Sequence, residues 1–377
     1  MTLVFILIML HIESGSGFFR TNCTILSRKM FNLKFNSSLV VLPMQMIAQG
    51  FEGQLCYQYK EYKSLKDAQV AKARYPIFLQ YWIEHIHSHT QSEGNEKKIY
   101  YFVATWTDGY RTNIPYSGSG LKLCQFPEYK FKDNSRLFQK AEQSIDAITC
   151  YPILHRNHLV FAMSAHITDN YSILIPDTMY IQSEGYKTKR ALLNENQIPF
   201  KSKINKLLYR GSVDLGQLSN IKIKHSTLGK IQRKYLFHLF NENVFDKSLV
   251  NFHEKDYMSI EEQIKYKYIL DIEGTANSWA GTFWKLYSGS LVLKADGIWK
   301  QWYYDKLFPW VHYVPVNQNF SDLMDKIKWC LQNEDRVIQI VNNSRRFIEE
   351  ELNWESVKNF TIQTFNNRYY KSFYVNI

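Results

Sequence analysis

Two carboxylates and a group of small polar residues interrupt an otherwise apolar stretch, YILDIEGTANSWAGTFWKLYSGSLVLK, at residues 268–294. Asp271 and Glu273 close the first apolar run, and the small residues 274–278 follow them. Small residues allow a ligand to approach the backbone, and free N–H groups at the start of a helix suit a phosphate. A carboxylate can accept hydrogen bonds from sugar hydroxyls. The pattern therefore indicates a site for a phosphorylated, hydroxyl-rich ligand.

The elements around these residues are predicted to form a strand, a loop, a helix and a second strand. KYILDI and SLVLK are the strands, and SWAGTFWKLYSG is the helix, with Ser278 as its N-cap and Gly289 as its C-cap. Such a loop opens at the carboxyl end of a parallel sheet, where α/β proteins bind ligands. The residues EGTANS match neither G-x-G-x-x-G nor a P-loop, which disfavours dinucleotide oxidoreductases and NTPases.

Strands and helices also alternate along the rest of the chain. Continuous apolar strands separated by helices predict parallel sheets covered on both faces. Two further helices are expected near the C-terminus, one with Ser321 as its N-cap and one starting from Asn333. The additional strands are predicted by their β-branched and aromatic content at 98–106, 158–164, 171–176, 205–211 and 311–316.

Composition is typical of a globular protein, with 45% hydrophobic and 21% charged residues. A length of 377 residues suggests two domains. No apolar run approaches the ~20 residues that a membrane-spanning helix needs. Five widely spaced cysteines without a C-x-x-C pair disfavour a zinc site. Residues 1–29 are an uncertain leader or upstream extension, so the compartment stays open: cytoplasmic or membrane-peripheral is favoured, and the secretory-pathway lumen is the alternative.

The net charge of +11 is concentrated in one segment. Residues 187–234 contain twelve Lys or Arg and two acids, a net charge of +10. Such a run is either a solvated face or an anion site for nucleotide phosphate, anionic lipid or nucleic acid. KLLYRGS places Arg210 at the end of a strand, which favours a phosphate site. RNA-binding signatures and a helix-turn-helix pattern are missing, so no nucleic-acid partner is expected.

The segment DIEGTANSWAGTFWKLYSGSLVLKADGIWKQWYYDKLFPWVHYVPV resembles the signature region of family 90 glycosyltransferases. That family includes protein O-glucosyltransferases, fungal capsule xylosyltransferases and bacterial lipopolysaccharide-core sugar transferases. Two further segments, ILIPD at 173–177 and KINKLLYRGS at 203–212, occur in the order that the family has. The similarity covers residues 158–350, and residues 1–97 carry almost none.

The resemblance implies an α/β fold of GT-B type, in which two Rossmann-like domains face each other across a cleft. After residues 1–29, an acceptor-side domain would occupy 30–186 and a nucleotide-sugar-binding domain 187–350. Residues 351–377 would pack back on the N-terminal domain.

The resemblance also implies transfer of a sugar, glucose or xylose, from a UDP-sugar to a hydroxyl, with inversion by an Asp general base. The expected partners are the UDP-sugar donor, a glycan, lipopolysaccharide core, lipid-linked glycan or protein acceptor, and an anionic membrane surface for peripheral association. No metal and no cofactor besides the donor substrate is expected. The alternatives are a catalytically silent relative that binds sugar nucleotides or glycans, and a basic nucleic-acid-binding protein.

Carried over by position, the resemblance places diphosphate contacts at Arg210, Gly211 and Ser212. Many members carry an Arg in the helix after the small residues, whereas this chain has SWAGTFWK, so Lys285 or Lys294 would supply that charge. The match with WAGTFWKLYSGS favours the lipopolysaccharide-type branch over the protein-modifying one. The nucleotide-sugar pocket is expected to be lined by Glu273, Gly274, Thr275, Asn277, Ser278, Trp279 and Lys294.

Family members carry an Asp base after a strand in the N-terminal domain, and YYFVATWTDGYR places Asp108 in that position. Asp177 in ILIPD is the alternative base, although a PD pair after a strand also fits a turn former. Asp271 and Glu273 mimic the metal-binding D-x-D of GT-A transferases. The GT-B interpretation needs no metal and makes Asp271 a strand-end residue.

Overall fold

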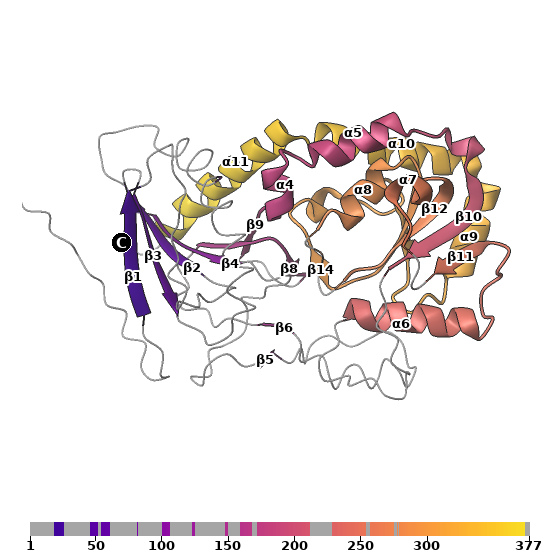
Figure 1. The fold of residues 1–377 in the computed structure, drawn as a ribbon, viewed down its shortest axis with the longest axis horizontal. Helices are drawn as coiled ribbons and strands as arrows, with labels where there is room; N and C mark the ends of the chain where they lie inside the picture. The colour runs from indigo at the N-terminus through magenta and orange to yellow at the C-terminus, as the bar shows by residue number, and fades with distance from the viewer. Residues whose placement is uncertain are drawn as a thin grey trace, which may run out of the picture.

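The computed structural model describes residues 19–25, 46–51, 54–60, 81, 100–105, 123–124, 148–149, 159–167, 172–211, 228–253, 257–274, 277 and 279–373. Two larger sheets organise these residues. A six-stranded sheet belongs to the N-terminal half and a five-stranded sheet to the C-terminal half, and they lie side by side along the long axis of the molecule (Figure 1).

The C-terminal sheet is parallel, with the strand order β11-β10-β12-β13-β15. Of the strands in this sheet, β10 comes first along the chain, and it lies between the second (β11) and the third (β12). This is the 2-1-3-4-5 order of a doubly wound sheet. The order therefore reverses between β10 and β12, and this switch point is where such sheets bind ligands. The strands span Ile204–Arg210 (β10), Val250–His253 (β11), Tyr266–Asp271 (β12), Leu291–Ala295 (β13) and Val314–Val316 (β15).

Helices cover both faces of this sheet, as the alternation of apolar strands and helices predicts (Figure 1). One core joins the sheet to α6 and α9, and the other joins it to α5 and α8, while α10 contributes to both. The helices are α4 (Thr178–Gln182), α5 (Lys187–Glu195), α6 (Leu228–Asn241), α7 (Ile260–Gln263), α8 (Gly281–Tyr287), α9 (Leu323–Gln332), α10 (Glu334–Glu350) and α11 (Trp354–Phe373).

The N-terminal sheet is mixed, with the order β1-β3-β2-β4-β7-β9. The strands β4, β7 and β9 are parallel to one another. The neighbours β1, β3, β2 and β4 pair in antiparallel fashion. Parallel strands and covering helices confirm the predicted α/β class, and two sheets, one in each half, are the arrangement that the GT-B type requires. The strands span Phe19–Ile25 (β1), Met46–Phe51 (β2), Gln54–Lys60 (β3), Tyr100–Thr105 (β4), Leu159–Ala162 (β7) and Ser172–Leu174 (β9).

A short ribbon joins the two halves. Strand β8 (Ala165–His166) pairs with β14 (Trp299–Lys300) in antiparallel fashion, and Ile167 N donates to Ile298 O at 2.9 Å. A second connection comes from the C-terminal helix, where Tyr81 Oη donates to Thr361 Oγ1 at 3.2 Å. Two minor strands, β5 (Leu123–Cys124) and β6 (Ile148–Thr149), pair with each other. The division into domains at 29, 186 and 350 stays a prediction.

Three predicted helix caps, Ser278, Gly289 and Ser321, are wrong by one or two residues. The N-cap of α8 is Ala280, because residues 279–280 form a turn before the first helical residue, and its C-cap is Ser288, with Gly289 following at φ +69°. The N-cap of α9 is Asp322, because the Ser321 hydroxyl is engaged by Asn317 Nδ2 at 3.1 Å in the preceding turn.

Asn333 is the N-cap of α10, as predicted. Within the described ranges, no helix combines the length and the apolar character that crossing a membrane requires.

Candidate functional site

Three ionisable residues lie level with one another at the carboxyl ends of adjacent strands. Asp271 on β12 is paired in register with Lys294 on β13. The register Leu208↔Ile269 between β10 and β12, continued by two residues, puts Arg210 level with Asp271. Arg210 and Lys294, two of the residues expected to bind the ligand, are thus brought to the switch point of the sheet.

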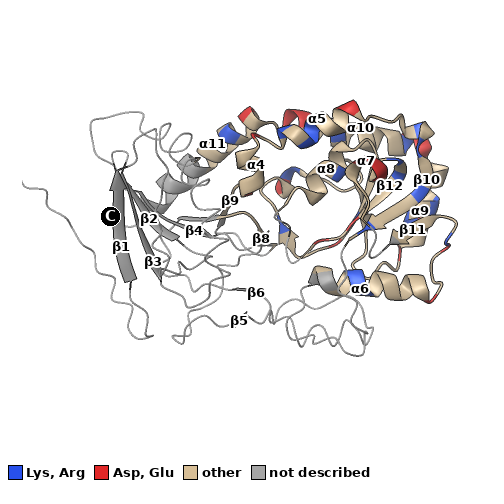
Figure 2. Cartoon of the chain, in the orientation of Figure 1, with Lys and Arg blue, Asp and Glu red and all other residues tan. Residues whose placement is uncertain are grey.

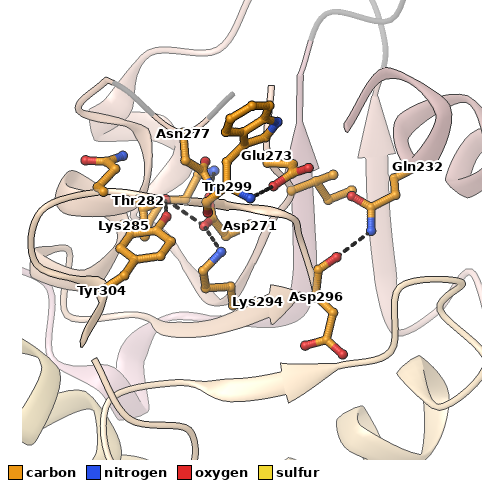
Figure 3. Close-up of polar contacts among 12 residues, drawn as sticks. Gln232, Asp271, Glu273, Asn277, Thr282, Lys285, Lys294, Asp296, Trp299 and Tyr304 are labelled. Atoms are coloured by element: carbon orange, nitrogen blue, oxygen red, sulfur yellow. Dashed lines mark hydrogen bonds and ion pairs between the residues drawn. The ribbon is translucent and has the colours of Figure 1, made fainter. Parts of the chain in front are cut away.

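Asp271 is the centre of a buried ionic cluster (Figure 3). Lys285 Nζ donates to its Oδ1 at 2.6 Å, and Thr282 Oγ1 donates to Oδ2 at 2.8 Å. Lys294 Nζ lies 3.7 Å from the same Oδ2. Burial alone would raise the pKa of Asp271, but the two lysines hold it well below its usual range. Both carboxylate oxygens are engaged, so Asp271 is a structural anion, in agreement with its expected role as a strand-end residue.

Lys294 differs from Lys285 in how its charge is used. Its ammonium lies 5.0 Å from the centroid of the Tyr304 ring and 3.7 Å from Asp271 Oδ2, a longer contact than that of Lys285. Burial would lower the pKa of Lys294, but Tyr304, Asp271 and Glu273 around it raise the pKa above its ordinary value. Lys294 is therefore a permanent cation at the carboxyl edge of the sheet. Lys285, bound to Asp271 at 2.6 Å, is committed to the cluster.

Glu273 lies two residues beyond Asp271 and is 2% exposed. Its Oε2 accepts hydrogen bonds from Ile298 N at 3.0 Å and Trp299 N at 3.2 Å. Its other oxygen, Oε1, is buried and has no hydrogen-bond partner among the described residues. Burial raises the pKa of Glu273 to about 7, against the opposing effect of Lys294 and the two backbone N–H groups. This carboxyl group changes its protonation near neutral pH.

The first turn of α6 packs directly on the backbone at Glu273. A Cβ built on Gly229 would lie 2.1 Å from Glu273 O and 2.3 Å from Gly274 O, so only glycine fits there. One turn later, Gln232 is fully buried, and its Nε2 donates to Asp296 O at 2.8 Å and Gln318 O at 3.1 Å. Sequence reasoning missed Gln232, because a single Gln in a basic helix has no motif around it.

The small residues after Glu273 are tied to β14. Asn277 Nδ2 donates to Trp299 O at 3.3 Å, and Gln301 Nε2 donates to Trp279 O at 3.2 Å. Since β14 also pairs with β8, the loop is hydrogen-bonded to the ribbon that joins the two halves. Glu273 and Asn277, which were expected in one pocket with Trp279, are therefore both bonded to Trp299 of β14, and Trp279 is bonded to Gln301 directly after this strand.

The chain matches the family described as Glycosyl transferase family 90 over residues 173–376, which is more than half of its length. The chain belongs to glycosyl transferase family 90. The matched range contains β10 and β12, the two strands on either side of the switch point. The family assignment and the geometry therefore concern the same part of the molecule. The resemblance inferred from the motifs is confirmed.

Several curated relatives share segments of this range. The chain is 29% identical to uncharacterized protein 035R of Invertebrate iridescent virus 3, over 44% of this chain and 17% of the relative. It is 30% identical to protein O-glucosyltransferase 2 of Danio rerio, over 31% of this chain and 25% of the relative. It is 35% identical to protein O-glucosyltransferase 3 of Homo sapiens, over 23% and 17%. The chain thus spans a quarter or less of the length of these relatives.

Among solved structures, Anabaena Alr3699/HepE in complex with UDP-glucose is similar with a TM-score of 0.33 and 11% identity, over 55% of this chain and 64% of that chain. A likeness at this TM-score is too weak to carry an argument. The assignment of the fold therefore stands on the topology of the two sheets.

Asp177, the alternative base, is a helix cap in this family 90 protein. Its Oδ1 accepts from Met179 N at 3.0 Å and Tyr180 N at 3.1 Å, and Oδ2 accepts from the hydroxyl of Tyr186. Burial raises the pKa of Asp177 to about 6, against the effect of these hydrogen bonds. With both oxygens occupied by the chain itself, Asp177 acts as the turn former that its sequence context suggested.

Four of the predicted site residues lie outside the described residues: the base Asp108 and the loop residues Ser212, Thr275 and Ser278. Gly211 and Gly274 are described, and they directly follow the end of β10 and Glu273. The roles assigned to all six stay predictions.

The basic segment is divided between different tasks. Lys203 is buried, and its Nζ donates to Ile264 O, Ser288 O and Ser290 Oγ at 2.5–3.2 Å. The guanidinium of Arg190 donates to Leu352 O at 2.6 Å beyond the end of α10. Lys and Arg elsewhere in the described part are interspersed with Asp and Glu along the helices (Figure 2). At least two charges of the segment therefore hold the fold together and are not available to an anion.

Among the described residues, no group of three or more His, Cys, Asp or Glu is arranged to hold a metal ion. The residues at the switch point include two cations, Arg210 and Lys294, and one buried acceptor oxygen, Oε1 of Glu273. Independence from metal stays a prediction.

Proposed function

We propose that this chain is a glycosyltransferase that moves a sugar, glucose or xylose, from a UDP-sugar to an acceptor hydroxyl. One observation carries the proposal. The motif segment KINKLLYRGS contains the carboxyl end of β10, and DIEGTANSW starts at the carboxyl end of β12, so both segments lie at the switch point of one doubly wound sheet. Permanent cations and buried acceptors meet there, and a nucleotide diphosphate sugar needs both. The names of the O-glucosyltransferase relatives agree with this activity.

Donor binding is assigned to the edge formed by β10, β12 and β13. Arg210 contacts the diphosphate through charge-assisted hydrogen bonds, with Gly211 and Ser212 beside it. Lys294 supplies the second positive charge, because Lys285 is held by Asp271 at 2.6 Å. The start of α6, which touches Glu273 and Gly274, adds the positive end of a helix dipole at the same edge.

The transfer step requires a base and a stabilised leaving group. In the proposed reaction, Asp108 removes the proton of the acceptor hydroxyl as that oxygen bonds to the anomeric carbon of the donor. The bond from this carbon to the β-phosphate oxygen breaks, and the electron pair leaves with UDP, whose charge Arg210 and Lys294 balance. Attack from the face opposite the leaving group inverts the anomeric centre.

The acceptor is a hydroxyl of a glycan, a lipopolysaccharide core, a lipid-linked glycan or a protein. The motif WAGTFWKLYSGS favours the lipopolysaccharide-type branch, whereas the named relatives are protein O-glucosyltransferases, which favours a protein. Peripheral association with an anionic membrane is part of the same proposal, resting on the net charge of +11.

A donor screen tests the function. Purified protein is incubated with UDP-glucose, UDP-xylose and other UDP-sugars, UDP release is measured, and the product with each acceptor class is weighed by mass spectrometry. Release of UDP from one donor, with a mass increase of one sugar on an acceptor, is the expected result. Absence of both release and UDP binding would contradict the proposal.

A catalytically silent relative is the second candidate, and one observation favours it. Many members have an Arg in the helix where this chain has SWAGTFWK, and the nearby Lys285 is engaged by Asp271. Binding of a UDP-sugar without UDP release, at every acceptor tried, would select this alternative. Salt-dependent RNA binding without UDP binding would instead indicate the nucleic-acid-binding protein.

A further inference from the structure

We propose that the loop at residues 308–311 anchors the protein to an anionic bilayer. Its apolar tip inserts between the lipid headgroups, and arginines at its base contact their negative charge. The inference rests on the proposed function, because it assigns the peripheral membrane association to one surface of the C-terminal half. The loop consists of Phe308, Pro309, Trp310 and Val311.

Four consecutive apolar residues reach the surface in this loop. Phe308 is 55% exposed and Val311 is 38% exposed, while Pro309 is also exposed and Trp310 is partly buried. Single apolar side chains are common on protein surfaces, but runs of three or four exposed ones are avoided unless they have a function. The run therefore indicates a partner that accepts apolar side chains.

The loop keeps its shape through its own backbone. Trp310 N donates to Tyr313 O at 2.7 Å, and His312 N donates to Phe308 O at 3.0 Å. Phe308 N in turn donates to His312 Nδ1 at 3.0 Å. Trp310 has φ +62°, a left-handed conformation that is costly for a bulky residue and persists only where the surroundings fix it. The apolar tip is thus a fixed projection.

The base of the loop is packed on α9 and α10. The centroid of the Trp310 ring lies 4.9 Å from that of Trp329 on α9. Directly after the loop, the centroid of the His312 ring lies 4.8 Å from that of Phe347 on α10. These contacts bury one side of the loop and leave its tip exposed.

Two arginines of α10 lie at the base of the loop. Arg336 Nη2 donates to Trp310 O at 3.3 Å. Arg346 lies near His312, whose pKa is lowered by burial and by this positive charge. Both arginines are exposed, and neither forms an ion pair with an acid of the described ranges. Their charge is therefore available to an anionic partner.

Within the part of the chain that the structure describes, the charges that interact with the loop are all positive. Lys326 Nζ lies 4.8 Å from the centroid of the Trp310 ring, although Asp322 Oδ2, at 3.5 Å, balances part of its charge. Asp335 and Glu350 are exposed on α10, but neither is bonded to the loop. An apolar tip with a cationic base suits an anionic bilayer, whose acyl chains receive the tip and whose headgroups attract the cations.

A bilayer suits this loop better than a second protein does. A stable protein–protein interface buries about 800 Å² on each partner. An aromatic side chain buries about 150–250 Å², and this tip has one strongly exposed aromatic ring, that of Phe308. Binding to a bilayer instead grows with each apolar side chain inserted and with each cation near the headgroups. Trp310 also fits this partner, since tryptophan is enriched at the headgroup level of membranes.

Vesicle sedimentation tests the anchor. The full chain is mixed, without nucleotide, with vesicles of phosphatidylcholine alone or of equal parts phosphatidylcholine and phosphatidylserine, and the bound fraction is measured after centrifugation. Phe308→Ser/Val311→Ser removes the apolar tip. Val244→Ser/Tyr257→Ser is the matched control, because these two side chains are 55% and 92% exposed at other places in the C-terminal half.

A second pair of variants tests the cations. Arg336→Gln/Arg346→Gln removes the two positive charges at the base of the loop. Lys187→Gln/Lys265→Gln removes the same charge from exposed positions, at the start of α5 and after α7. Thermal denaturation reports whether each variant is folded, and light scattering reports its oligomeric state.

The wild type should bind the anionic vesicles about tenfold or more above the neutral ones, because the arginines contribute only at a charged surface. Phe308→Ser/Val311→Ser should lower binding to the anionic vesicles about tenfold or more, through the lost apolar burial. Arg336→Gln/Arg346→Gln should lower it about tenfold. Both control variants should bind nearly as the wild type does.

Equal binding by Phe308→Ser/Val311→Ser and the wild type would overturn the anchor, and so would a wild type that binds neither kind of vesicle. Self-association that this variant abolishes, without vesicle binding, would assign the loop to a second copy of the chain. Failure of the proposed function gives a different result, since the wild type would then bind the anionic vesicles but not UDP.

Discussion

Gly297 lies so close to Glu273 that a Cβ on it would be 2.1 Å from the carboxylate oxygen Oε2 and 2.7 Å from the carboxyl carbon. The absence of a side chain at Gly297 is thus what allows Glu273 to reach Ile298 N and Trp299 N. Through the bond to Trp299 N the carboxylate is attached to β14, and β14 pairs with β8 of the N-terminal half.

Gly297→Ala should therefore displace the Glu273 carboxylate. We expect UDP affinity to fall about tenfold or more, and the free energy of unfolding to fall by about 1–3 kcal/mol, the usual cost of overpacking. Calorimetry and chemical denaturation measure the two effects. Gly281→Ala is the control: a Cβ there meets nothing within 4 Å, and alanine in α8 should be neutral or stabilise slightly. Equal behaviour of the two variants would contradict the contact.

Arg210→Ala tests the diphosphate contact. Loss of a charge-assisted hydrogen bond should weaken UDP binding by about 1.5–3 kcal/mol. Lys201→Ala removes the same charge from an exposed position before β10, so it should bind UDP as the wild type does. Unchanged affinity in Arg210→Ala, with a folded protein by thermal denaturation, would remove Arg210 from the site.

Glu273 should make stability depend on pH near neutrality. Its pKa is near 4.5 in the unfolded chain and is raised by burial to about 7 in the fold. Between these values the folded protein keeps a proton that the unfolded chain releases, so the free energy of unfolding falls as pH rises through this window. Glu273→Gln should remove this dependence, which amounts to a few kcal/mol of the free energy of unfolding over the whole window.

The slope is measured by denaturation at a series of pH values. Asp177, with its pKa raised to about 6, adds a slope of the same sign from about pH 4 to 6, and it is present in both proteins. UDP affinity should rise with pH through about 7, because ionised Glu273 is the better acceptor of a hydroxyl. An identical pH profile of unfolding in Glu273→Gln would show that Glu273 is ionised throughout.

Asp108→Asn tests the general base. Transfer should fall by about 10²–10⁴-fold, while UDP-sugar binding stays unchanged, because the donor is assigned to the C-terminal sheet. Asp177→Asn should instead lower the free energy of unfolding by about 0.5–2 kcal/mol through the weakened cap of α4, and should keep transfer. Near-normal transfer in Asp108→Asn would assign the base to another residue.

Excess EDTA tests the predicted independence from metal. Arg210, Lys294 and the start of α6 are assigned to balance the charge of UDP, so UDP release should persist in the chelator. Activity that is lost in EDTA and restored by manganese would show that an ion takes part in the reaction.

The order of elements and their types could be predicted from the amino-acid sequence. KYILDI and SLVLK are apolar enough to be recognised as buried strands, and the helix between them has the matching periodicity, so β12, α8 and β13 occur where expected. Strand identity depends on local composition, which a window of residues contains. The exact caps are not determined by composition, because they depend on hydrogen bonds that form in the folded chain. The Ser321 hydroxyl accepts from Asn317 Nδ2 in the preceding turn, and Asp322 is the N-cap of α9.

The composition of the site was decided by the tertiary structure. Lys285 and Lys294 were equal candidates for the ligand charge until packing placed Lys285 against Asp271 at 2.6 Å. The partners of Glu273 lie 25 and 26 residues further along the chain, and Gln232 reaches carbonyls 64 and 86 residues away. No local pattern encodes such contacts, because they arise only when the doubly wound sheet brings the carboxyl ends of its strands to one edge.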